Sequence, residues 1–191
     1  MAASASPRVT GIVLAAGAGR RFGGPKALAS DASGTPWVQR AVDALQGGGC
    51  DGVIVVLGAA AAQAALLVPP SASVVVAAEW EAGLSRSLAA GMDAAGDADA
   101  VILVPVDTPA LPAAAVTRIR TAAGEDARHA LVRSTYGGHP GHPVLVGSVH
   151  WGHLRAQLSG DAGAGAFLTR AGATAVECGD LWTGADHDRR P

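Results

Sequence analysis

Apolar residues along the chain form short continuous runs, which alternate with segments where they recur at helical spacing. The continuous runs predict buried strands at 9–15, 53–57, 74–77 and 100–106. The spaced segments predict helices at 36–45, 59–68, 84–95 and 112–122. Strands and helices that alternate in this way favour an α/β fold with three α/β/α layers around a mostly parallel, Rossmann-like central sheet.

The last third of the chain has a mixed pattern. It predicts strands at 129–134, 143–146 and 173–178 and helices at 150–158 and 164–170. The 191 residues match the size of one medium domain. We therefore expect a single domain over 9–191, preceded by a flexible N-terminal tail at 1–8, where the residues are mostly small and polar.

Composition narrows the functional classes. Hydrophobic residues make up 49% of the chain and aromatic residues only 4%, which predicts a core built from Ala, Val, Leu and Ile. The 14 basic and 16 acidic residues give a net charge of -2 without a basic stretch, which argues against a nucleic-acid partner. The sequence has no signal peptide and no apolar run of about 18 residues, so we expect a cytoplasmic protein with no membrane partner.

A glycine-rich segment, LAAGAGRRFGGPK, follows the first predicted strand. Such a loop lets backbone N–H groups approach phosphate oxygens, and Arg20 and Lys26 add positive charge. A Walker A loop would need Gly before the lysine, where Pro25 stands, and a dinucleotide-binding GxGxxG would need Gly in place of Phe22. The segment therefore predicts either a phosphate site of another kind or a flexible turn with two surface charges.

An acidic residue, Asp107, ends the fourth predicted strand. A carboxylate at the C-terminal end of a buried parallel strand lies where α/β sheets bind their ligands, and Mg²⁺ prefers one or two carboxylates together with phosphate oxygens. Asp107 is thus a candidate magnesium ligand, and the alternative is that it only caps the turn before the next helix.

The segment LAAGAGRRFGGPKAL resembles the LAAGxGxRxGxxK signature of the MobA-like NTP transferases, and most closely their molybdenum cofactor cytidylyltransferase branch. The resemblance implies the nucleotide-diphospho-sugar transferase type of fold. It also implies a loop that wraps a triphosphate, with Arg20 and Lys26 neutralising the charge. The remaining loop contacts to the nucleotide would come from Leu14, Ala15, Ala16, Gly17 and Gly19. The LAAG form of the signature favours CTP over GTP.

Two further segments fit the same resemblance. VPVDTP resembles the family's metal-binding acid, which assigns Mg²⁺ to Asp107. GLSRSL resembles a family segment at the start of a helix and implies nucleotide contacts from Gly83, Ser85 and Ser87, although Ser85 is also a candidate helix cap. The family often carries an Asn upstream of this segment, where Glu79 and Trp80 stand here.

The C-terminal third carries the candidate acceptor residues. GHPGHPVL resembles GxxGHPVLF and places His142 in a Gly/Pro turn that faces the acceptor pocket. GDAGAG resembles GDxGAR and implies acceptor binding by Asp161, for which a plain helix N-cap is the alternative. Gly165 replaces the family's Arg, so the acceptor-phosphate contact is either missing or supplied by another residue, Arg155 or Arg170.

The C-terminal tail departs from the family pattern. Family members usually end in a stretch whose acid helps to hold the metal, and here the tail reads ADHDRRP. Asp186 and Asp188 are the candidate second metal ligands, and a frayed charged tail is the alternative.

These features predict an Mg²⁺-dependent nucleotidyltransferase that moves CMP from CTP to molybdopterin or a similar phosphorylated acceptor, with transient contact to a molybdoenzyme. A guanylyltransferase and a sugar- or alcohol-phosphate nucleotidyltransferase are enzymatic alternatives. A non-catalytic chaperone of the molybdenum cofactor is a further alternative, which Gly165 and the shortened tail favour.

Overall fold

The computed structural model describes residues 6–188, so most of the expected tail at 1–8 lies outside the described residues. The strands are β1 (Val9–Ala15), β2 (Gly52–Leu57), β3 (Ser73–Val76), β4 (Ala100–Pro105), β5 (Leu131–Tyr136), β6 (His139–Gly147) and β7 (Thr174–Glu177). The α-helices are α1 (Trp37–Gly47), α2 (Ala61–Ala65), α3 (Leu84–Ala94), α4 (Ala113–Ala122), α5 (Trp151–Gln157) and α6 (Gly165–Arg170). Short 3-10 helices occur at Lys26–Leu28, Trp80–Ala82, Ala127–His129 and Ser148–His150.

All these strands form one sheet in the order β3-β2-β1-β4-β6-β5-β7. Only β6 runs antiparallel, since it pairs antiparallel with both β4 and β5 while the other pairs are parallel. The expected mostly parallel sheet is confirmed. In the centre, Leu14 of β1 lies beside Pro105 of β4. Because the two strands end side by side, the segments that follow them leave the sheet at neighbouring points.

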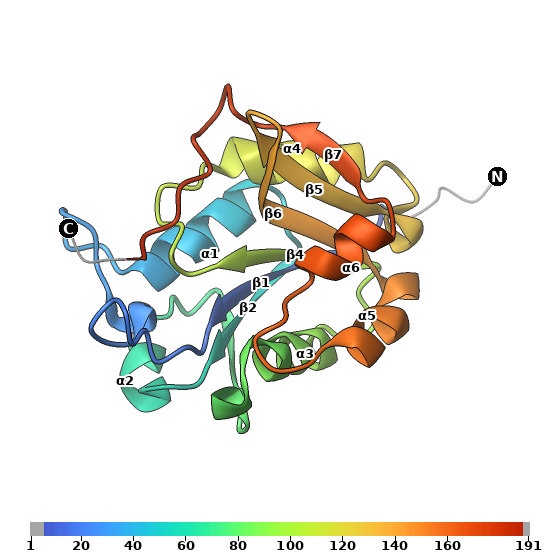
Figure 1. Cartoon of the computed structure of the whole chain (residues 1–191). Helices are drawn as coiled ribbons and strands as arrows, with labels where there is room; N and C mark the ends of the chain where they lie inside the picture. The colour runs from blue at the N-terminus through green and yellow to red at the C-terminus, as the bar shows by residue number, and fades with distance from the viewer. Residues whose placement is uncertain (1–5, 189–191) are drawn as a thin grey trace.

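Helices cover both faces of this sheet (Figure 1), which confirms the three-layer arrangement. The residues of β1 alternate between the two layers: Val13 belongs to the apolar cluster that includes residues of α1, α2 and α4, and Ile12 to the cluster that includes residues of α3, α5 and α6. Two glycines let the helices approach closely. A Cβ on Gly11 would lie 2.8 Å from Leu45, and a Cβ on Gly91 would lie 2.8 Å from Ile12. The core is therefore tightly packed on both faces, and most of its buried side chains are aliphatic.

The helix expected over 59–68 is much shorter in the structure, where α2 covers Ala61–Ala65. Ala60 adopts the left-handed conformation at φ 54°, and helix-like periodicity in an alanine-rich segment does not require a longer helix. Leu66, which the sequence pattern placed inside this helix, is 86% exposed.

The two strands expected at 129–134 and 143–146 form one longer hairpin, β5–β6. Its turn is Gly137-Gly138, where both residues have positive φ values that favour glycine. The expectation that His142 lies in a turn before the strand is therefore wrong, because His142 lies within β6. None of the helices at residues 6–188 is long and apolar enough to cross a membrane.

Candidate active site

The loop between β1 and the 3-10 helix at Lys26–Leu28 closes on itself through Gly19. The Gly19 carbonyl accepts hydrogen bonds from the N–H groups of Gly23 and Gly24, at 2.9 and 3.1 Å. Gly19 has φ 59°, and a Cβ there would lie 1.9 Å from the Gly24 oxygen. Only glycine fits this turn, which folds the loop back so that Lys26 faces the end of β4.

Lys26 joins two carboxylates that are far apart in the sequence. Its Nζ donates to Asp107 Oδ2 at 2.7 Å and to Asp188 Oδ1 at 3.1 Å. Burial by itself lowers the pKa of Lys26, but the hydrogen bonds and charges of the two aspartates outweigh it, so this pKa lies above its ordinary value. The side chains of Lys26 and Asp107 are 15% and 19% exposed, so this pair is the partly buried centre of the site.

A central cleft of about 570 Å³ opens beside this pair. Most of the site residues predicted from the sequence line it: Leu14, Ala15, Ala16, Gly17, Gly19, Arg20, Lys26, Gly83, Ser87, Asp107, His142 and Asp161. Ser85 does not line it. Ser85 is 4% exposed, and its backbone N–H donates to the Gly160 carbonyl. This hydrogen bond helps to hold the first turn of α3 against residues 160–161.

Residues 11–175 match the family described as the MobA-like NTP transferase domain. The chain belongs to the MobA-like NTP transferase family. A relative named nicotine blue oxidoreductase, from Paenarthrobacter nicotinovorans, is 35% identical over an alignment of 190 positions that covers 95% of this chain and 93% of that protein. The description of the family refers to transfer from an NTP, whereas the name of this relative refers to an oxidation or reduction.

Solved structures confirm the fold. The Rv0371c homologue from Mycobacterium sp. strain JC1 is 28% identical and superposes with a TM-score of 0.79, covering 95% of this chain and 91% of its own. Rv0371c of Mycobacterium tuberculosis H37Rv, solved in complex with manganese, is 24% identical, with a TM-score of 0.72 and coverage of 90% and 88%. The fold is that of the nucleotide-diphospho-sugar transferases, as the sequence predicted.

Carboxylates that could hold a metal ion in this MobA-like protein lie around Lys26. Asp107 and Asp188 share its ammonium group, although of the three candidate aspartates only Asp107 lines the cleft. The charge of Asp186 slightly opposes the lowering of the His142 pKa. Within residues 6–188, no cluster of three or more His, Cys, Asp or Glu side chains is placed to bind a metal ion. Two carboxylates fit a divalent ion whose other ligands are phosphate oxygens and water.

Two residues at the site carried no motif in the sequence. Trp80, from the 3-10 helix at Trp80–Ala82, lines the central cleft and packs against Gly58, where a Cβ would lie 2.5 Å from the indole. Its ring is available to stack on a nucleobase. Arg133 of β5 lies near His142, whose pKa is lowered by burial and by the Arg133 charge, against the opposing charges of Asp107 and Asp186.

The expected replacements for the family's arginine lie elsewhere. Arg155 pairs with Asp93 at 2.7 Å, and Arg170 hydrogen-bonds to Gln157. Arg133 instead reaches the α6 position, where its Nη2 donates to the Gly165 carbonyl at 2.6 Å. The cation beside α6 therefore comes from β5.

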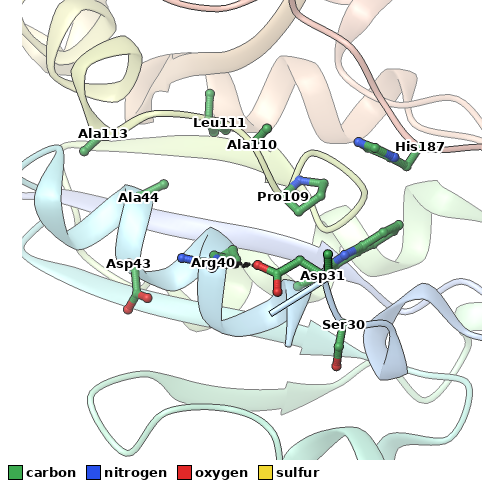
Figure 2. A pocket seen from close by; sticks show the side chains of 12 residues that line it. Ser30, Asp31, Arg40, Asp43, Ala44, Pro109, Ala110, Leu111, Ala113 and His187 are labelled. Carbon is green, nitrogen blue, oxygen red and sulfur yellow. Dashed lines mark hydrogen bonds and ion pairs between the residues drawn. The ribbon is translucent and has the colours of Figure 1, made fainter. Parts of the chain in front are cut away.

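A larger and more open hollow of about 790 Å³ lies beside α1 and the loop before α4 (Figure 2). Two of its charged residues pair with each other, since Arg40 Nε donates to Asp31 Oδ2 at 2.7 Å. None of the predicted site residues lines it. His187 lies at this hollow, and its N–H donates to the Asp107 carbonyl at 2.9 Å, which links the C-terminal tail to the end of β4.

Proposed function

We propose that this protein is a divalent-metal-dependent nucleotidyltransferase that transfers CMP from CTP to a phosphorylated, molybdopterin-like acceptor and releases pyrophosphate. One observation carries the proposal: Lys26 and Asp107 meet at 2.7 Å in a cleft that the glycine-rich loop also lines. The cation that would bind phosphate, Lys26, and the carboxylate that would bind the metal ion, Asp107, therefore lie at one point of the cleft. Membership of the MobA-like NTP transferase family supports the reaction type.

The reaction we propose is an in-line displacement at the α-phosphorus. An oxygen of the acceptor phosphate forms a bond to that phosphorus, and the bond from phosphorus to the bridging oxygen of pyrophosphate breaks. The attacking oxygen is already anionic, so no strong general base is needed. Arg20 and Lys26 stabilise the negative charge that develops on the departing pyrophosphate, and the cleft holds both reactants in line.

Asp107 and Asp188 would hold the divalent ion, with Mg²⁺ as the expected metal. The ion would neutralise phosphate charge and orient the phosphate oxygens. The manganese complex of Rv0371c supports a divalent-metal site in this fold. The CTP preference rests on the LAAG form of the loop, and molybdopterin rests on the resemblance to the cytidylyltransferase branch.

The test is incubation of the protein with each NTP, Mg²⁺ and molybdopterin, followed by pyrophosphate measurement and product mass. We expect pyrophosphate with CTP and a product heavier by CMP. Release with GTP, or only with sugar or alcohol phosphates, would point to the alternative transferases. Tight cofactor binding without pyrophosphate from any NTP would refute transfer and support a chaperone.

A second candidate is an oxidoreductase, because the relative named nicotine blue oxidoreductase is 35% identical over nearly the whole chain. In that case the central cleft would bind a redox nucleotide, with Trp80 beside its ring. Oxidation of NADH or NADPH by a heteroaromatic dye, in the presence and absence of added flavin, measures this activity. Dye reduction without pyrophosphate release would favour this candidate over the transferase.

A further inference from the structure

A side cavity of about 210 Å³ branches from the central cleft at His142. His142 lines both spaces, and so do Leu14 and Leu84. Lys26 and Asp107 line only the central cleft, and Arg133 lines only the side cavity. A molecule whose reacting group lies at Asp107 can therefore extend past His142 towards Arg133.

The walls of the side cavity are otherwise apolar. They include side chains from four elements and from the end of β1: Leu14, Leu84, Leu88, Leu103, Val144 and Leu168. An engineered apolar cavity of about 150 Å³ admits benzene, so this cavity has room for a ring-sized group. Such walls favour an apolar ring and leave Arg133 and His142 as its polar recognition groups.

Arg133 is held in place without a counter-ion. Its Nη1 donates to Thr169 Oγ1 at 3.0 Å and its Nη2 donates to the Gly165 carbonyl at 2.6 Å. No carboxylate among residues 6–188 forms an ion pair with it. A guanidinium has five N–H donors, so two anchored donors leave the others for a ligand.

The physical chemistry of this arrangement favours an anion. Burial lowers the pKa of Arg133, because a partly desolvated guanidinium loses some of the hydration of its charge. An oxyanion beside the guanidinium would compensate this cost and form short charge-assisted hydrogen bonds. A neutral ligand would supply no such compensation.

We propose that Arg133 and the side cavity form a specificity subsite that binds an oxyanion attached to an apolar ring, at the end of the acceptor remote from its reacting phosphate. A pterin is polar and carries no oxyanion, so this subsite selects a phosphorylated acceptor other than molybdopterin itself. The role of this ligand as an acceptor rests on the proposed function, whereas oxyanion binding by Arg133 does not.

The test is calorimetric titration of the full-length protein with benzoate, phenyl phosphate and neutral benzamide. Benzoate and phenyl phosphate distinguish a carboxylate from a phosphate as the preferred oxyanion. In Arg133→Gln we expect the affinity for the preferred anion to fall by about tenfold or more. Arg170→Gln removes the same charge from nearby α6 and should leave the affinity unchanged. Equal anion affinity in Arg133→Gln and wild type, or tighter binding of benzamide than of both anions, would overturn the proposal.

A second measurement needs no variant and covers the case in which Arg133→Gln fails to fold. Phenylglyoxal modifies arginines, and peptide mass spectrometry reports each site. The preferred anion should protect Arg133 but not Arg170; equal modification of Arg133 with and without the anion would contradict the subsite.

The outcome separates the subsite from the proposed function. Anion binding at Arg133 without transfer from any NTP would refute the transferase and leave the subsite standing. Transfer with an acceptor KM that Arg133→Gln leaves unchanged would refute the role in acceptor specificity.

Discussion

Replacing Lys26 with methionine removes the ammonium group and nearly keeps the length of the side chain. In the free protein this group donates to Asp107 at 2.7 Å and to Asp188 at 3.1 Å. In the proposed reaction the same group faces the departing pyrophosphate. Lys26→Met should therefore change turnover and metal binding in opposite directions.

The expected sizes follow from the geometry. Loss of one electrostatic contact made in the transition state costs about 3 kcal/mol, or a hundredfold in kcat. The substitution also leaves two carboxylates without their shared cation. The Asp107 bond is partly buried and is worth about 1.5 kcal/mol, while the Asp188 side chain is 64% exposed and contributes little. Mn²⁺ should then bind the nucleotide-free variant about tenfold more tightly.

Pyrophosphate release at saturating CTP and acceptor measures turnover, and calorimetry with Mn²⁺ measures metal affinity. Lys26→Arg retains the charge and is the control. Because the folded-state pKa of Lys26 is raised, the stability from its ion pairs is complete below the ordinary lysine pKa of 10.5 and is lost as pH rises through the folded-state pKa. Full turnover, or unchanged Mn²⁺ affinity, in a folded Lys26→Met protein would refute the reasoning.

Four further substitution or labelling experiments follow from the site and its surroundings. Gly17→Ala should weaken CTP binding about tenfold without lowering Tm, because a Cβ there meets no protein atom within 4 Å and would obstruct only a ligand; unchanged affinity would mean that no ligand passes close to it. Gly19→Ala should lower both affinity and Tm, since its Cβ would collide with the loop backbone; an unchanged Tm would contradict this. Trp80→Ala should weaken CTP binding by about 1–3 kcal/mol if the indole stacks on the base, with Trp80→Phe as control, and equal affinities would exclude stacking. Burial raises the pKa of the Cys50 thiol to about 12, so a thiol reagent at pH 8 should label it slowly in the folded protein and fast in urea; rapid labelling of the folded protein would be inconsistent with this.

The central strands and the site that they hold were predictable because burial on both faces requires an apolar run. The strand expected at 9–15 is β1 (Val9–Ala15) with the same bounds. Its neighbour β4 has the same character, so Lys26 and Asp107 both follow strands that the apolar pattern identifies. The parallel register of β1 with β4 explains why they meet.

Other parts could not be predicted because their determinants are not local. The helical periodicity at 59–68 indicates only that this segment is compatible with a helix. Leu66 is exposed in the structure, so it packs against no buried surface that would stabilise a longer helix. Trp80 and Arg133 come from a 3-10 turn and from a strand, and neither belongs to the recognised motifs. The signal for Arg133 was a charged residue inside an otherwise mainly apolar strand, LVRSTY, and its approach to Gly165 depends on how β5 packs beside α6.

The two candidate reactions make opposite demands on Asp107. Asp107 and Asp188 both approach the lysine that would contact phosphate, and carboxylates so close to a polyphosphate are unfavourable unless a divalent cation lies between them. A metal-bound NTP meets this condition, whereas a redox dinucleotide binding without metal would be repelled. Asp107→Asn should therefore lower CTP-dependent pyrophosphate release about a hundredfold and abolish its response to Mn²⁺. For an oxidoreductase the same variant should bind the redox nucleotide at least as tightly as wild type. Titrating both nucleotides into wild type and Asp107→Asn, with and without Mn²⁺, decides between them: tighter dinucleotide binding by a variant that retains dye reduction would refute the transferase.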